Sequence, residues 1–228
     1  NQISNEELFA ALMHAPFLSD LFFGKKNLRT FRAEYLPFRH LERVTLSSTD
    51  ISSSGFEDFL YAPKLRVIEI AGCTNLQDFG MNCPPLEALR TLKAFNSSLT
   101  EKGMLSLLNQ AKYLEEIEIS HEDFETFDLQ IWEHLINLKN IKVILKPLAP
   151  VDIPRQISLL IQFLRNKHKI ERIEFYSFRS DDCRMSDFAG FSSLDLPNLK
   201  YISLSMLKSI DLESLFAIIK TAPMLEKD

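Results

Sequence analysis

Apolar residues recur along the chain in two alternating patterns, one typical of strands and the other of helices. Leu92 and Ala94 alternate with polar neighbours, as in a strand that is buried on one face. Apolar residues within 104–108 follow at helical spacing, and Ile117 and Ile119 then repeat the strand pattern 25 residues after the first. A strand and a helix that recur at this period predict a solenoid of stacked repeats.

Nine apolar residues begin these units: Leu18, Leu41, Leu65, Leu89, Leu114, Leu138, Ile170, Leu199 and Leu225. Consecutive starts lie 23 to 32 residues apart. The fourth and sixth residues of each complete strand are small or apolar, so we predict that they face the interior and that the residues between them face outward. Four of the starts follow an Ala-Pro or Leu-Pro pair, where proline ends the preceding helix.

Each predicted strand is connected to the next through an outer helix or turn, and this alternation predicts an α/β fold. The period is the one typical of leucine-rich repeats. We expect residues 1–228 to form a single right-handed leucine-rich-repeat solenoid, or horseshoe, with a parallel sheet on its concave face and helices and turns outside. Outer helices are predicted at residues 6–14, 55–61, 100–112, 154–167 and 212–221.

Residues 27–38 allow a second interpretation. Leu28, Phe31 and Ala33 also fit the strand pattern, but they lie only 13 residues before Leu41, which is too short for a unit. We therefore assign this segment to the outer side of the first repeat.

Two insertions lengthen neighbouring repeats directly after their strands, at residues 146–154 and 178–185. The first is rich in proline and the second in charged residues. Because loops on a regular scaffold often carry function, we expect these two to form one rim of a binding site.

The outer segments carry a more specific signal. Residues 49–56 and 97–104 resemble the "I-T-D-x-G-L" element of the cysteine-containing leucine-rich repeats, and residues 70–76, which include Cys73, resemble their "L-x-G-C-x-x-L" element. Such repeats are typical of F-box proteins, which are substrate receptors of cullin-type ubiquitin ligases, and of relatives without an F-box. The resemblance implies a domain that presents a bound protein to other machinery.

The chain departs from that family pattern in two ways. Cys73 is the one cysteine at the expected place, and we assign Ser48, Asn96 and His121 to the equivalent places in other repeats. No F-box sequence lies within residues 1–228. Since the chain does not begin with Met, we expect it to be part of a longer protein.

The net charge limits the classes of ligand that the chain could bind, and the cysteine content indicates its location. A net charge of -5 and a pI of about 5.6 argue against nucleic acid or an anionic membrane as ligand. The basic cluster of residues 165–169 is interpreted as the positively charged end of a helix. Three cysteines without paired spacing predict reduced thiols and an intracellular location, cytoplasmic or nuclear. No apolar run approaches the length of a membrane span.

Enzymatic chemistry finds little support in the sequence. No nucleophile elbow, phosphate-binding loop or metal-ligand spacing is present, and six glycines are too few for a nucleotide cradle. The nearest approach to a ligand cluster, His121-Glu122-Asp123, follows a predicted strand where a polar turn is expected anyway. Cys73 is interpreted as a small buried hydrophobe. We predict no catalysis, no cofactor and no metal.

The remaining class of function is recognition of a partner at the protein surface, and we predict that the partner is another protein or a peptide. The outward strand positions mix both charges with aromatic side chains, which are enriched at binding hot spots. We select as candidate contacts Lys142, Ile144, Arg172, Glu174, Tyr176, Phe95, Glu118 and Tyr201. Each could equally be part of a solvated sheet face. A structural scaffold, an innate sensor and a pathogen effector are alternative roles for the same fold.

Overall fold

The computed structural model describes residues 4–24, 27–34, 36–78, 83–120, 134–145, 153–177, 191, 193–203, 216, 219–220 and 222–225. The chain divides into two units, Asn1–Leu114 and Glu115–Asp228. Within each unit the strands pair in sequence order, and every pairing that the structure describes is parallel. The α/β class and the open parallel sheet are therefore confirmed, while the single leucine-rich-repeat horseshoe stays a prediction.

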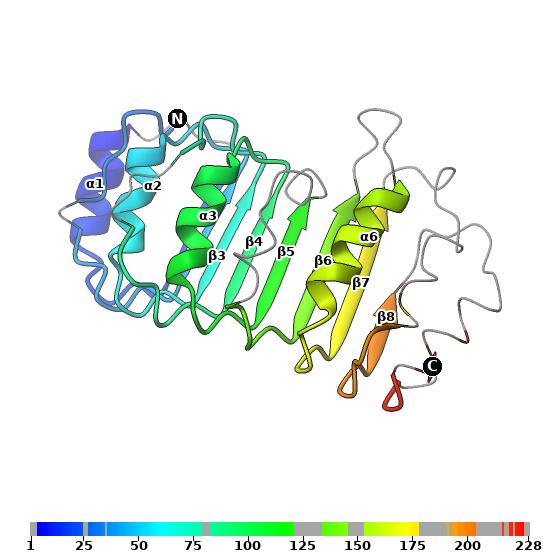
Figure 1. The fold of residues 1–228 in the computed structure, drawn as a ribbon. Helices are drawn as coiled ribbons and strands as arrows, with labels where there is room; N and C mark the ends of the chain where they lie inside the picture. Colours follow the sequence, from blue (N-terminus) through cyan, green and yellow to red (C-terminus); the bar gives the residue numbers. More distant parts are fainter. Residues whose placement is uncertain are drawn as a thin grey trace. The chain divides into compact units, whose positions relative to one another are not determined.

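The first unit alternates strands with helices or irregular outer segments. Its elements are α1 (Asn5–Met13), β1 (Asp20–Gly24), β2 (Arg43–Ser47), α2 (Ser53–Leu60), β3 (Val67–Ala71), β4 (Thr91–Phe95) and α3 (Glu101–Gln110). The three helices lie on the same side of the strands (Figure 1). No helix of the described residues of this unit covers the opposite face of the strands (Figure 1).

The second unit repeats the arrangement with longer connections. Its elements are β5 (Glu116–Ser120), β6 (Asn140–Leu145), α6 (Ile153–Leu164), β7 (Arg172–Ser177) and β8 (Tyr201–Ser203). Helix α6 lies over one face of β6 and β7 (Figure 1). Its apolar residues Leu160 and Leu164 are buried, which places them in the core of this unit.

The strands form because their apolar residues alternate with polar ones. In β2 and β3 the inward residues Val44, Leu46, Ile68 and Ile70 are fully buried, whereas their outward neighbours keep contact with solvent. Register pairs equivalent positions across the sheet, so inward residues stack on inward residues. A shift by one residue would turn the apolar set to solvent, and this alternation therefore fixes the register.

A recurring turn precedes each strand and confirms the predicted repeat starts. The backbone N–H of each of the nine residues donates to the carbonyl three residues earlier, at 3.1 to 3.4 Å. The donors are Leu18, Leu41, Leu65, Leu89, Leu114, Leu138, Ile170, Leu199 and Leu225. Next, one carbonyl accepts from two residues of the following repeat: Ser19 O accepts from Glu42 and Arg43, at 2.7 and 3.0 Å. The same local geometry recurs at spacings from 23 to 32 residues, so the repeat is structural as well as sequential.

A left-handed residue ends three successive strands of the first unit and corrects one of our assignments. Ser48, Gly72 and Asn96 have φ of 53°, 65° and 50° and lie 24 residues apart. The residues equivalent to Cys73 are therefore Thr49 and Ser97, not Ser48 and Asn96. The sequence alone did not show this, because serine and asparagine suit several positions of a turn. The left-handed backbone at Ser48 and Asn96 shows which of these positions they occupy.

Segment 27–38 belongs to the outer layer, as predicted. Leu28, Phe31 and Ala33 are buried without forming a strand. The Phe31 ring stacks on Phe59 of α2 at 6.1 Å and meets Phe23 of β1 edge-on at 5.8 Å. Aromatic side chains therefore replace a helix in filling the interior of this repeat.

The helix boundaries follow side-chain caps. A capping box begins α1, with Ser4 Oγ accepting from Glu7 N and the Glu7 carboxylate accepting from Ser4 N. Ser52 and Thr100 cap α2 and α3. The insertion residues 146–152 and 178–185, His121 to Asp123 and most of 212–221 lie outside the described residues.

Candidate protein-interaction surface

The outward face of the second unit brings predicted contact residues into rows. Register places Glu118, Lys142 and Glu174 side by side on β5, β6 and β7. The row beside it pairs Arg172 with Tyr201. Neighbouring strands lie about 4.8 Å apart, so side chains in one row can touch.

Lys142, on β6, contacts one side chain of each adjacent strand, Glu118 of β5 and Tyr176 of β7. Its ammonium lies 2.9 Å from Glu118 Oε1 and 4.8 Å from the centre of the Tyr176 ring. Glu118 is buried to 7 % exposure, and a buried carboxylate needs such a cation to offset its lost hydration. The pair therefore holds Lys142 over the tyrosine ring.

Arg172 makes the corresponding contacts in the next row. Its Nε lies 3.3 Å from Glu174 Oε1, and its guanidinium carbon lies 4.1 Å from the centre of the Tyr201 ring. The ion pair with Glu174 joins the two rows, and the Tyr176 hydroxyl donates to the other oxygen of the same carboxylate, Glu174 Oε2, at 2.8 Å. We call the six linked residues the strand-face network: Glu118, Lys142, Arg172, Glu174, Tyr176 and Tyr201.

The pKa of Tyr176 reports on this network. Its hydrogen bond to the Glu174 carboxylate raises the pKa, with smaller contributions from desolvation and from the charge of Glu174. Glu174→Gln should lower the pKa of Tyr176, because the amide accepts a hydrogen bond without carrying charge. Carbon-13 NMR of the tyrosine rings between about pH 9 and 12 measures this change. Glu116→Gln, on the same face, is the matched control and should leave the pKa of Tyr176 where it is; equal effects of the two variants would contradict the network.

Two of the candidate contacts lie apart from the network. Ile144 is on the outward face in register with Tyr176, but it is buried to 7 % exposure between its neighbours and offers little surface. Phe95 is half-buried at the end of β4 and belongs to the first unit. Their contact with a partner stays a prediction.

The first unit carries an ion-pair row of its own on its outward face. Arg43 lies 3.4 Å from Asp20 and 3.2 Å from Glu69, and Lys93 lies 3.8 Å from the same Glu69 oxygen. Thr45 adds a hydrogen bond to Glu69 at 3.2 Å. Glu69 and Lys93 were not among our selected residues, although alternating charge at matching strand positions was the signal that could have found them.

The described cysteines are poor nucleophiles. The Cys73 thiol is fully buried, shares a hydrogen bond with Thr49 Oγ1 at 3.3 Å and lies 3.7 Å from the Leu46 carbonyl. Burial raises the pKa of the Cys83 thiol to about 11, with a smaller contribution from the charge of Glu57. A thiolate is the reactive form, so this shift lowers reactivity at neutral pH.

The described residues contain no group of three or more histidine, cysteine, aspartate or glutamate side chains placed to hold a metal ion. They also contain no helix that is both long and apolar enough to cross a membrane.

Comparison with known proteins does not assign the chain to a family. No protein-family model matches the chain, and no curated protein matches its sequence. The resemblance to leucine-rich repeats and to F-box proteins therefore stays a prediction from the sequence motifs at residues 49–56, 70–76 and 97–104.

Proposed function

We propose that the protein is a non-catalytic module that binds another protein or a peptide on the outward strand face of its second unit. The observation that carries this proposal is the strand-face network. Six side chains from four strands form one connected set on a face whose opposite side is packed against the core.

The network supports binding because its side chains are held before a partner arrives. Arg172 and Tyr176 keep 49 % and 39 % of their surface exposed, yet each is fixed by Glu174. Arginine and tyrosine are the residue types most enriched at binding hot spots. Holding them in place reduces the side-chain entropy that association would otherwise cost.

The electrostatics of the face favour a protein partner over a polyanion. Lys142 is paired with Glu118 and Arg172 with Glu174, so neither cation is left to neutralise phosphates. Nucleic-acid binding draws on clustered unpaired cations, and the chain as a whole carries a net charge of -5. A partner that presents both charges together with apolar groups complements this surface best.

The biological role that we propose is recognition of substrates for an F-box-type ubiquitin ligase. Its support is the resemblance of residues 49–56, 70–76 and 97–104 to the cysteine-containing repeats. The role belongs inside the cell, in keeping with the free thiols of Cys73 and Cys83. Removing the protein from cells should then lengthen the half-life of its bound partner; an unchanged half-life would instead favour a scaffold.

The double variant Arg172→Ala with Tyr176→Ala tests the binding face. It should weaken partner binding by at least about 2 kcal/mol, roughly 30-fold in Kd, because two hot-spot side chains are lost. Partners are first captured from a lysate with the wild-type chain and identified by mass spectrometry. Their affinity for purified variants is then measured by calorimetry.

A matched control pair exists away from the strand face. Arg90 lies over the Tyr113 ring at 5.3 Å, so Arg90→Ala with Tyr113→Ala removes the same side chains and the same type of contact. This control should keep its affinity. Equal affinities of the two double variants, or a loss confined to the control, would contradict the proposal.

A further inference from the structure

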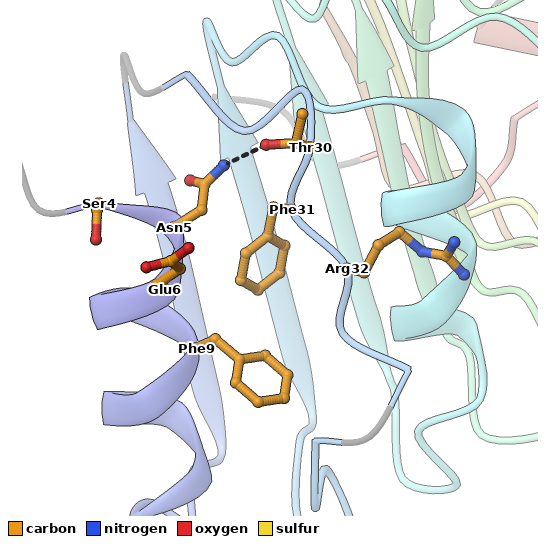
Figure 2. Close-up of a pocket in the computed structure, with 7 residues that line it drawn as sticks. All are labelled: Ser4, Asn5, Glu6, Phe9, Thr30, Phe31 and Arg32. Atoms are coloured by element: carbon orange, nitrogen blue, oxygen red, sulfur yellow. Dashed lines mark hydrogen bonds between the residues drawn. The ribbon is translucent and has the colours of Figure 1, made fainter.

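A pocket lies in the first unit, outside the strand face. Glu6 and Phe9 line it from α1, and Thr30, Phe31 and Arg32 line it from the facing segment (Figure 2). Its volume is about 710 Å³, within the usual range for ligand sites. Asn5 Nδ2 donates to Thr30 Oγ1 at 3.0 Å and bridges the two walls at one end.

Phe9 is the aromatic side chain of the pocket that a ligand can reach, because it is only half-buried on α1. Phe31 is 1 % exposed, and its ring packs on the rings of Phe23 and Phe59 at 5.8 and 6.1 Å, so it supports the base of the pocket. The Phe9 ring suits the methylene stem of a long side chain and, through its face, a cation.

The start of α1 does not favour an anion in this pocket. Helix N-termini attract anions through unsatisfied backbone N–H groups. Here the Ser4 side chain accepts from Glu7 N, and the Glu7 carboxylate accepts from Ser4 N at 2.8 Å. A negative charge from the protein itself already occupies this position.

The positive charge of Arg32 is also neutralised. Its Nε and Nη2 donate to the two Asp58 oxygens at 2.9 and 3.1 Å, and Nη2 lies 3.5 Å from Glu34. The hydrogen bond to Asp58 raises the pKa of Arg32. Glu6 has neither a hydrogen-bond nor an ion-pair partner within the described residues, so that part of the chain does not balance the negative charge of Glu6.

We propose that this pocket binds a basic side chain, arginine or lysine, of a peptide or protein. The aliphatic stem lies against Phe9, and the cationic head meets the Glu6 carboxylate at the rim. The site is separate from the strand-face network, so neither proposal depends on the other.

Titration of the nitrogen-15-labelled chain with four blocked amino acids tests the pocket. The probes are the N-acetyl amides of arginine, lysine, norleucine and glutamate. Arginine and lysine probes should give saturable NMR shifts at the amides of residues 5–9 and 30–32. Norleucine, which has the stem without the charge, should bind at least about fivefold more weakly, and glutamate should not bind.

Three variants sharpen the test. Glu6→Gln should weaken binding of the arginine probe about fivefold. Glu34→Gln is the matched control, because it removes a nearby carboxylate that does not line the pocket, and it should change the affinity less than twofold. Phe9→Ala should abolish the saturable shifts, with its melting temperature measured to show that the chain remains folded.

Several outcomes would overturn the proposal. Equal affinities for the norleucine and lysine probes would show that the pocket binds only the apolar stem and does not recognise the charge. Binding of the glutamate probe, equal losses in Glu6→Gln and Glu34→Gln, or no saturable shift with any probe would each reject a cation site.

Discussion

Leu92→Asp should lower the free energy of unfolding by roughly 5 kcal/mol, enough to unfold the first unit. Leu92 is fully buried on the inward face of β4, in register with Ile68 of β3. Aspartate would place an unpaired carboxylate there and leave a cavity as well. Because each repeat completes the core of its neighbours, the loss should spread beyond β4.

The neighbouring residue of the same strand provides the control. Thr91 faces outward and is half-buried, so Thr91→Asp should cost about 1 kcal/mol or less. Urea unfolding followed by circular dichroism measures both variants. Ile117→Asp repeats the test in the second unit, where Ile117 is fully buried. Wild-type stability of Leu92→Asp would contradict the assigned strand register.

Gly55→Val and Gly103→Val should each cost about 3 kcal/mol. Both glycines stand at the third position after the N-cap of their helix. A Cβ at Gly55 would come closer than 3.0 Å to the carbonyl oxygen of Phe31, and one at Gly103 equally close to that of Gln77. These oxygens belong to the backbone of the preceding outer segment, which cannot turn aside as a flexible side chain can. Valine also has a low helix propensity.

Gly24→Val is the matched control for these variants. A Cβ at Gly24 would meet only the exposed Phe22 ring, at 3.0 Å, and that ring is free to move. Valine also favours a strand, so stability should change by less than about 1 kcal/mol. Thermal unfolding of the three variants measures the difference. Equal destabilisation at all three positions would show that the close approach of helix and outer segment is not what selects glycine.

The strands could be predicted because their signal is local. Alternation at Val44 and Leu46, or at Ile68 and Ile70, fixes which face is buried without any knowledge of neighbouring strands. The capping box at Ser4 and Glu7 is equally local. The length of the turn after each strand is not encoded by a local signal. For this reason we assigned the residues equivalent to Cys73 one position too early.

The strand-face network could be predicted in membership but not in its connections. Outward positions follow from alternation, whereas the contact of Lys142 with Glu118 and Tyr176 depends on rotamers and on neighbouring strands. The burial of Ile144 also depends on the neighbouring strands. Its own strand marks it as outward, and its neighbours decide how much of it stays exposed.

Lys167 shows what the charge pattern alone did not reveal. Its cluster directly follows the end of α6 at Leu164, which agrees with our interpretation as the positive end of a helix. Lys167 itself, however, is only 3 % exposed, with its ammonium 5.5 Å from the centre of the Phe163 ring. Its carbonyl accepts from Ile170, the turn position that Ala62 and Leu135 fill in other repeats. A lysine can occupy this apolar position because its long stem packs like a hydrocarbon.

Photo-crosslinking tests the proposed binding face most directly. A benzoylphenylalanine replaces Tyr201 on the strand face in one protein and Tyr61, the 64 % exposed C-cap of α2, in another. Irradiation of each with the captured partner is followed by mass spectrometry. The proposed face predicts a crosslink from position 201 and none from position 61. Crosslinking from position 61 alone would place the partner on the helical side and contradict it.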